Sequence, residues 1–390
     1  MRDQIEKYTG KLLKDRLAMP GSVRFYALDD ELIVSKDDDW KPIFEAVLNE
    51  LSVVGLLLAA PTLPFADNLI ARSTDAETRV YPKDSEVKTF LHDIPFIRKS
   101  ALDEGGELAK AIAAILRERK GLIIEGVGFV ATGTVTLEQA YITYSSIFHT
   151  TFIKYLLELL EHGWRLPGEQ GALERFQNEW SQPAEVEKLA FRDGPLTARS
   201  EIMEEMCAVG RYTVENGLVD SFFGNISLFD DGVIYISQTG ASLDELEGLI
   251  DPVPMDNSST YGITASSELP VHRRIYESSS YTTIIHGHPK FSVIMSMLCD
   301  KRASCEIVDC GKDCPEIRLI DGVPIVSGEI GAGGIAKTVP PVIREYGRAL
   351  VYGHGLFCAG AYDFKDAFNG LVQVETLCRR RYFEMLAAGF

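Results

Sequence analysis

The chain has 390 residues, of which 46% are hydrophobic and 25% are charged, so it is long enough for two or three globular domains. Its formal net charge of −18 argues against nucleic acid as a partner, because phosphate backbones are bound by basic surfaces. The sequence contains no run of about 18 apolar residues, and its charged N-terminus lacks the apolar core of a signal peptide. We therefore expect a cytoplasmic protein without membrane contact.

The seven cysteines all follow residue 200, which sets the second half of the chain apart from the first. An odd number of cysteines without a signal peptide predicts reduced thiols. The pair Cys310-x3-Cys314 could help to bind a metal, but this alternative is less favoured because no second pair accompanies it.

Between the halves, residues 163–195 form a polar stretch with Pro167-Gly168 and Gly194-Pro195, which predicts a linker that contains a short helix. The second half then alternates helical and strand patterns. Helices are predicted over residues 196–216, 267–277, 291–298, 335–345 and 363–388, and strands within 224–237 and over 282–286, 324–327, 349–352 and 356–359. This alternation indicates a layered α/β domain, and its tight connections indicate a mixed sheet.

The two halves are related by a weak internal repeat. IIEGVGFVATG (residues 123–133) and LVYGHGLFCAG (residues 350–360) share three glycines at an offset of 227 residues. Upstream, residues 42–61 align with residues 270–289 at an offset of 228. The sequence therefore predicts a tandem pseudo-repeat, with a degenerate domain at 1–162, the linker at 163–195 and a second domain at 196–390.

Polar residues of the second copy face apolar or bulky residues in the first. His286 faces Leu58, His288 faces Ala60, His354 faces Val127, and Glu268 faces Trp40. We therefore expect a second domain equipped for chemistry and a first domain that lacks metal ligands.

His286 and His288 end a β-branched run, and residues two apart on a strand point to the same face. Two imidazoles on one face could bind one metal ion, with His354 in Gly-His-Gly as a third ligand. The alternative is a pair of solvated histidines at a strand end and a third histidine in a hairpin turn.

Short hydroxyl-rich and glycine-containing segments come before the histidines. In TASSE (residues 264–268), Ser266 or Ser267 is expected to be a helix N-cap. The alternative is that these serines bind an anion at the helix N-terminus, with Glu268 as a base. The segments FGNIS (223–227) and SQTGAS (237–242) are either turns or further anion-binding loops.

Together, G-N-I-S, T-G, S-S-E, H-x-H and H-G resemble the class II aldolase/adducin family, in the family's order and approximate spacing. The resemblance is strong over residues 196–390, whereas the first half is similar to a worn form of the same fold. It implies a three-layer α/β/α sandwich with a mixed, mostly antiparallel sheet.

The resemblance also implies roles for individual residues. Glu268 would be the catalytic acid/base, and would cap the metal when substrate is absent. The metal would be Zn²⁺, or alternatively Mn²⁺ or Co²⁺, held by His286, His288 and His354. The substrate phosphate would be held by Asn225, Thr239, Gly240, Ser266 and Ser267.

The function implied is a metal-dependent aldolase-type lyase that cleaves or forms a C–C bond in a small, phosphorylated, ketose-like substrate through an enediolate. The alternatives are a sugar-phosphate 4-epimerase, a dehydratase or decarboxylase, and a non-catalytic adducin-like association module. The family also implies a homo-oligomer, here a dimer that forms a pseudo-tetramer.

Family aldolases use a loop tyrosine after H-x-H as a second acid, but residues 299–322 contain no tyrosine. The sequence offers other candidates, namely Asp309, Lys312, Asp313 and Tyr382.

Overall fold

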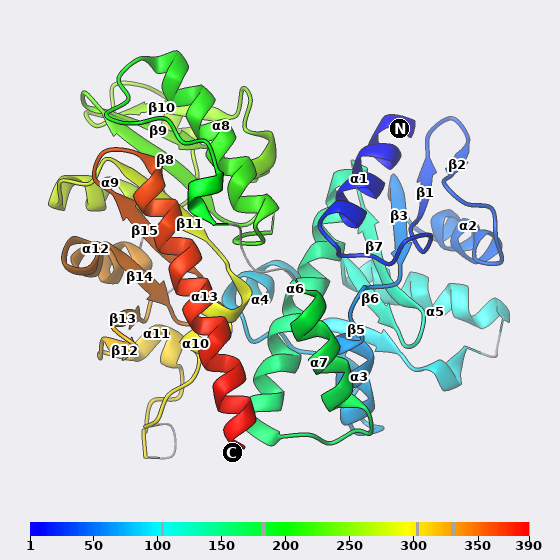
Figure 1. Cartoon of the computed structure of the whole chain (residues 1–390). Coiled ribbons are helices and arrows are strands. Elements are labelled where there is room, and N and C mark those ends of the chain that lie inside the picture. The colour runs from blue at the N-terminus through cyan, green and yellow to red at the C-terminus, as the bar shows by residue number, and fades with distance from the viewer. Residues whose placement is uncertain (103–104, 181–184, 221, 302–303, 329–332, 390) are drawn as a thin grey trace. The chain divides into compact units, whose positions relative to one another are not determined.

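The computed structural model describes the chain except residues 103–104, 181–184, 221, 302–303, 329–332 and 390. Its internal contacts divide the chain into a first unit, residues 1–180, and a second unit, residues 181–389 (Figure 1). No helix among the described residues is long and apolar enough to cross a membrane.

The division falls inside the range expected to link the two halves. Helix α7 (Glu169–Glu179) lies in this range and belongs to the first unit. The buried Glu169 carboxylate accepts hydrogen bonds from Arg72 Nε at 2.7 Å and from the Tyr155 hydroxyl at 3.0 Å. The linker expected from residue 163 therefore begins later, because α7 is fixed to the first unit by a buried ion pair.

The first unit contains a seven-stranded sheet in the order β2-β1-β3-β7-β6-β5-β4. Its strands are β1 (Arg24–Leu28), β2 (Leu32–Val34), β3 (Gly55–Ala59), β4 (Arg79–Val80), β5 (Ile94–Ile97), β6 (Gly121–Ile124) and β7 (Gly128–Gly133). The helices besides α7 are α1 (Arg2–Lys14), α2 (Lys41–Glu50), α3 (Phe65–Arg72), α4 (Ser85–Leu91), α5 (Gly105–Glu118) and α6 (Leu137–His162).

The second unit contains an eight-stranded sheet in the order β10-β9-β8-β11-β15-β14-β13-β12. Its strands are β8 (Asn225–Asp230), β9 (Val233–Ser237), β10 (Ile250–Pro254), β11 (Thr283–Gly287), β12 (Arg318–Ile320), β13 (Val323–Val326), β14 (Arg348–Val351) and β15 (Leu356–Gly360). Its helices are α8 (Arg199–Glu215), α9 (Leu269–Ser278), α10 (Lys290–Ser296), α11 (Cys310–Asp313), α12 (Ile335–Tyr346) and α13 (Phe364–Ala388).

Side chains that alternate along the strands bury both faces of the second sheet. Ile284 and Phe357 pack with α9 and α12 in one apolar cluster. Their neighbours Ile285 and Cys358 point to the opposite face, and Gly370 of α13 lies against the Cys358 side chain there. The second unit is thus a three-layer α/β/α sandwich with a mixed sheet, as the sequence predicts.

The two sheets share one topology. Without the edge strand β10, the second strand order repeats the first strand by strand. In each sheet one pair is parallel, β5 with β6 and β13 with β14, and the other pairs are antiparallel. The register also repeats, since Leu58 faces Val130 in the first sheet and His286 faces Phe357 in the second. This is the arrangement that the tandem pseudo-repeat predicts.

The shared glycines have the same structural reason in both units. A Cβ atom at Gly355 would lie 2.5 Å from the carbonyl oxygen of Gly287. At Gly128 it would lie 2.2 Å from the carbonyl oxygen of Ala59, which is the matching position on β3. Gly353 and Gly126 both have positive φ, 58° and 72°. The glycines therefore serve the hairpin, whereas the histidine between two of them occurs in the second unit alone.

The helices and strands predicted for the second half all occur, with ends shifted by a few residues. Among the α-helices and β-strands of the described residues, β10, β12 and α11 were not predicted. Strand β10 contains Pro252 and Pro254, and proline cannot donate a ladder hydrogen bond. The strand is possible because it lies at the edge of the sheet.

We predict that Phe44→Ala destabilises the first unit by about 3–5 kcal/mol, the usual cost of an aromatic truncation in a core. Phe44 is fully buried and stacks on Tyr26 with ring centroids 4.8 Å apart. Hydrogen exchange of the β3 and α2 amides under denaturant titration measures the loss. The control Val135→Ala, at a position 70% exposed, should change stability by less than about 0.5 kcal/mol. Equal protection in both variants would contradict the core assignment.

Candidate active site

Three histidines of the second unit converge on one point. One ring nitrogen from each of His286, His288 and His354 lies within 4.8 Å of the other two. Each side chain is only 1% exposed. The rings of His286 and His354 are stacked with centroids 5.0 Å apart, and the His288 ring lies edge-on to both. The structure therefore brings together the three predicted metal ligands.

The antiparallel pairing of β11 with β15 places these rings. His286 faces Phe357 across the ladder, and the two rings stack at 3.8 Å. His354 sits in the β14–β15 turn, which is held by the hydrogen bond from Gly353 N to Ser296 Oγ at 2.8 Å. His286 and His354 are 68 residues apart in sequence. The end of strand β11 and the β14–β15 turn thus bring them together at the ends of central strands of the sheet.

A buried carboxylate fixes the segment that follows His288. Glu375 of α13 accepts hydrogen bonds from the backbone N–H of Phe291 and Ser292, at 3.1 and 2.8 Å, and from the Ser292 hydroxyl. These groups form the first turn of α10, which begins two residues after His288. At the offset of 227, the residue that matches Glu375 is Phe148, so this clamp belongs to the second unit.

The environment of His286 leaves one nitrogen facing the centre. Its Nδ1 lies 3.1 Å from the carbonyl oxygen of Leu356, which only accepts, so Nδ1 carries the proton. Among the described residues, His286 Nε2 has no hydrogen-bond partner, although Glu268 Oε2 is 3.4 Å away. Burial lowers the pKa of His286 to about 4, even though the Glu268 carboxylate favours the charged ring. This is the neutral imidazole, held by a backbone carbonyl, that metal sites use.

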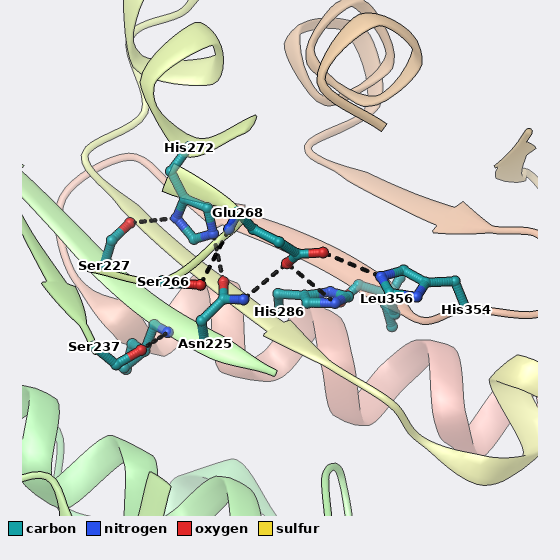
Figure 2. A network of polar contacts seen from close by, with 10 residues as sticks. Asn225, Ser227, Ser237, Ser266, Glu268, His272, His286, His354 and Leu356 are labelled. Carbon is teal, nitrogen blue, oxygen red and sulfur yellow. Dashed lines mark hydrogen bonds and ion pairs between the residues drawn. The ribbon is translucent and has the colours of Figure 1, made fainter. Parts of the chain in front are cut away.

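Glu268 lies against the triad (Figure 2). Its Oε1 is 3.1 Å from His354 Nε2, and its Oε2 accepts a hydrogen bond from Asn225 Nδ2 at 2.8 Å. Burial alone would raise the pKa of Glu268, but the hydrogen bonds from His354 and Asn225 hold this pKa well below its usual range. The side chain is 5% exposed and is held ionised, so it is placed to accept a proton.

Asn225 belongs to a longer chain of polar contacts behind Glu268. His272 Nε2 lies 2.6 Å from Asn225 Oδ1, and Ser227 Oγ lies 2.6 Å from His272 Nδ1. The Tyr276 hydroxyl lies 2.6 Å from Ser227 Oγ. All four side chains are buried, and burial lowers the pKa of His272 to about 3. Of these four residues, the sequence analysis named only Asn225 as a site residue. His272 and Tyr276 could have been found from the repeat, because they align with the apolar residues Phe44 and Leu48 of the first half.

The residues expected to hold phosphate lie on two adjacent segments. Gln238 and Ala265 form an antiparallel bridge, and Thr239 N donates to Thr264 O at 3.0 Å. This pairing brings together four of the five expected residues, Thr239, Gly240, Ser266 and Ser267. Ser266 is buried and the other three are exposed. Asn225, the fifth, instead turns its amide to Glu268.

The helix start near Glu268 differs from the expected N-cap. Helix α9 begins at Leu269, with Pro270 in its first turn, so its N-cap residue is Glu268 and not Ser266 or Ser267. Ser266 Oγ accepts a hydrogen bond from Glu268 N at 3.3 Å. The carboxylate itself makes no capping bond, because it points to the histidines.

The candidates for a second acid differ in how they are held. Tyr382 is fully buried and packs edge-on against Phe291 and Phe383. Asp309 caps α11 by accepting from Lys312 N. Lys312 and Asp313 lie on the exposed side of that short helix. None of the four takes part in the polar contacts of Figure 2.

The seven cysteines are all free thiols, as the sequence predicts. Cys310 and Cys314 do not belong to any cluster of three metal-ligating side chains among the described residues. The histidine triad is therefore the better candidate for a metal.

The residues of the triad fit a divalent cation. Three buried imidazoles are the protein ligands of many catalytic zinc sites, which keep a further position open. His354 would be the third ligand of such an ion, and its Nε2 lies 3.1 Å from Glu268 Oε1.

Comparisons with known proteins find relatives of the second half of the chain. The family described as Class II Aldolase and Adducin N-terminal domain matches residues 204–382. An L-fuculose phosphate aldolase of Methanococcus maripaludis is 26% identical over 168 residues, covering 43% of this chain and 83% of the relative. A methylthioribulose-1-phosphate dehydratase of Kluyveromyces lactis is 24% identical over 176 residues, covering 41% of this chain and 86% of the relative.

Solved structures that are similar include an L-fuculose-1-phosphate aldolase from Thermus thermophilus. It is 22% identical, covers 49% of this chain and 95% of its own, and has a TM-score of 0.38. A sugar-phosphate aldolase from Thermotoga maritima is 17% identical, covers 49% of this chain and 97% of its own, and has a TM-score of 0.37.

The second unit is thus a three-layer unit with a mixed sheet that holds a histidine triad beside a carboxylate. With the sequence match over residues 204–382, the second unit belongs to the class II aldolase and adducin family.

We predict that Gly355→Ala lowers metal content although no ligand is changed. A Cβ atom there would lie 2.5 Å from Gly287 O and 2.7 Å from His286 Cε1, so the triad must shift. The test is elemental analysis of protein purified with added Zn²⁺, in which wild type should hold about one ion per chain. Gly10→Ala, where a Cβ atom meets nothing within 4 Å, is the control and should retain the metal.

His286→Ala is expected to lose the metal in the same measurement, because catalytic sites depend on each of about three protein ligands. Metal content equal to wild type would remove His286 from the ligand set.

Proposed function

We propose that the second unit is a divalent-metal-dependent, aldolase-type lyase that cleaves or forms a C–C bond in a small, phosphorylated, ketose-like substrate through an enediolate. The observation that carries this proposal is the convergence of three buried imidazoles within 4.8 Å, next to an ionised carboxylate. The matching positions of the first unit hold Leu58, Ala60 and Val127. The polar set therefore goes beyond what the fold requires.

His286, His288 and His354 would hold the cation, for which zinc is our first choice and manganese or cobalt the alternatives. A bound divalent cation would supply Lewis-acid stabilisation of negative charge that develops on substrate oxygen. Near-complete burial of the rings keeps bulk water away from them and so strengthens their electrostatic interactions.

Glu268 supplies proton transfer in this proposal. Cleavage of an aldol requires a base to take the hydroxyl proton while the C–C bond breaks, and an acid to protonate the enediolate carbon. A single carboxylate can do both in turn. Glu268 suits this role because it is ionised, buried and fixed by Asn225 and His354.

The substrate phosphate would lie at the paired segments 237–242 and 264–267. In these segments Thr239 and Ser267 are exposed residues, the Thr239 hydroxyl donates to Ala265 O at 2.9 Å, and Gly240 has φ +73°. Hydroxyl and backbone N–H groups bind phosphate without a basic side chain. The names of the two relatives support a phosphorylated substrate, since both contain a sugar phosphate.

A dehydratase of the same family is the second candidate, because one relative is a methylthioribulose-1-phosphate dehydratase. Epimerisation and decarboxylation remain further alternatives. A non-catalytic association module is disfavoured, since it would not need three buried histidines around a carboxylate. Homo-oligomerisation stays a prediction, which light scattering checks.

Incubation of the zinc-loaded full chain with L-fuculose 1-phosphate and, separately, with methylthioribulose 1-phosphate separates these reactions. A lyase releases dihydroxyacetone phosphate from the first compound. A dehydratase removes water from the second without cleavage, and an epimerase gives an isomer of unchanged mass. Conversion of neither compound by any of these routes, with the metal bound, would count against the proposal.

We predict that Glu268→Gln keeps the metal but lowers kcat by about 10²–10⁴-fold, the usual contribution of a general acid or base. The control Glu247→Gln changes an exposed carboxylate of the same unit and should leave kcat unchanged. Turnover by Glu268→Gln at the wild-type rate would remove this residue from the mechanism.

A further inference from the structure

The polar chain behind Glu268 can be oriented bond by bond (Figure 2). Asn225 Nδ2 donates to the carboxylate at Glu268 Oε2, so the other amide atom, Oδ1, accepts. The nitrogen 2.6 Å from Oδ1 is His272 Nε2, which must therefore carry a proton. The direction of one bond thus fixes the direction of the next.

The far end of this series of hydrogen bonds has a defined direction as well. A neutral imidazole protonated at Nε2 has an accepting Nδ1, so the Ser227 hydroxyl donates to it. The Ser227 oxygen can then accept from the Tyr276 hydroxyl at 2.6 Å. Burial, which lowers the pKa of His272 to about 3, keeps the ring neutral as this pattern needs. Every donor points toward Glu268.

We propose that Tyr276, Ser227, His272 and Asn225 form a one-directional hydrogen-bond chain in which His272 is the central positioning residue for the Glu268 carboxylate. Hydrogen bonds in such a chain polarise one another, so each strengthens the one that reaches the carboxylate. An amide side chain has no acidic proton to pass on, and Asn225 is therefore a break in any proton path. The chain orients Glu268 and does not transfer protons.

Comparison with the first unit indicates that the fold does not require the hydrogen-bond chain. Leu58 pairs with Arg24, and His286 pairs with Asn225, so Arg24 and Asn225 occupy matching positions. By the same registers, Tyr26 matches Ser227. At the offset of 228, Phe44 matches His272 and Leu48 matches Tyr276.

In the first unit Arg24 forms an ion pair with Asp38, and the other three positions hold packed aromatic and aliphatic side chains. Tyr26 stacks on Phe44 with ring centroids 4.8 Å apart, and Trp40, which matches Glu268, lies against Phe44 at 5.9 Å. The fold is therefore complete without the polar chain. The chain is present where the triad and Glu268 are present, and is replaced where they are replaced.

This chain changes the role expected for Asn225. Both ends of its amide are engaged, one by Glu268 and one by His272. Asn225 is thus assigned to holding the acid/base, while the exposed segment pair carries the phosphate contacts.

This inference depends on the proposed function only because it takes Glu268 to be the acid/base. The geometry of the hydrogen-bond chain can be tested without measuring turnover. Ring-¹⁵N NMR of histidine-labelled, metal-free full chain reports which nitrogen of each imidazole is protonated. The His272 signal is identified by its loss in His272→Phe. We expect a neutral ring with the proton on Nε2, at pH 7. A proton on Nδ1, or a doubly protonated ring, would overturn the chain.

Kinetics of the zinc-loaded protein, with L-fuculose 1-phosphate as probe, test the positioning. His272→Phe, which installs the residue of the first unit, should keep the metal and the KM within about threefold, while kcat falls by about 10–100-fold. His272→Gln keeps an N–H donor at similar reach and should recover most of this loss. Ser227→Ala removes one link with a small change of volume and should lower kcat less. The control is His162→Phe at an exposed position of the first unit.

The two proposals can fail separately. Wild-type kcat in His272→Phe, with metal bound, would overturn the positioning role even if the lyase reaction is observed. If L-fuculose 1-phosphate is not turned over at all, the tautomer of His272 still tests the direction of the hydrogen-bond chain, because the NMR measurement needs neither metal nor substrate.

Discussion

The antiparallel ladder between β11 and β15 is the constraint on which the site depends. It sets His286 opposite Phe357, three residues beyond His354, and so converts a large sequence separation into contact between rings. A slip of one residue would turn His286 to the other face of the sheet. The ladder can approach this closely because Gly355 has no side chain to meet β11. The convergence of the three rings is therefore set by strand register more than by the histidines themselves.

Around this ladder, the chain builds the same frame twice and fills it differently. In the second unit, a carboxylate, three imidazoles and a polar chain lie between the sheet and α9. In the first, aromatic and aliphatic side chains occupy the corresponding space, including the stacked Tyr26 and Phe44. Buried polar groups contribute little net stability compared with well-packed apolar ones. Stability alone therefore does not account for the buried polar groups of the second unit.

Much of this could be predicted from the sequence, because the signals were local or repeated. The triad followed from His-x-His, from Gly-His-Gly and from the contrast with the other copy. Features set by three-dimensional context were missed. Strand β10 was not predicted because it contains two prolines. The N-cap residue of α9 is Glu268 and not one of the predicted serines. Tyr382, a candidate for the second acid, is fully buried. The role of His272 depends on the direction of hydrogen bonds, which no spacing in the sequence reveals.

The preserved glycines of the first unit carry an evolutionary consequence. Gly126 and Gly128 still shape their hairpin, although the residue between them is valine. Selection for a foldable chain is satisfied by those glycines alone and is indifferent to what stands between them. Mutation is thus free to erase the imidazoles from either copy without harming the scaffold. The three imidazoles converge in the second unit alone, so the needs of the hairpin do not explain them.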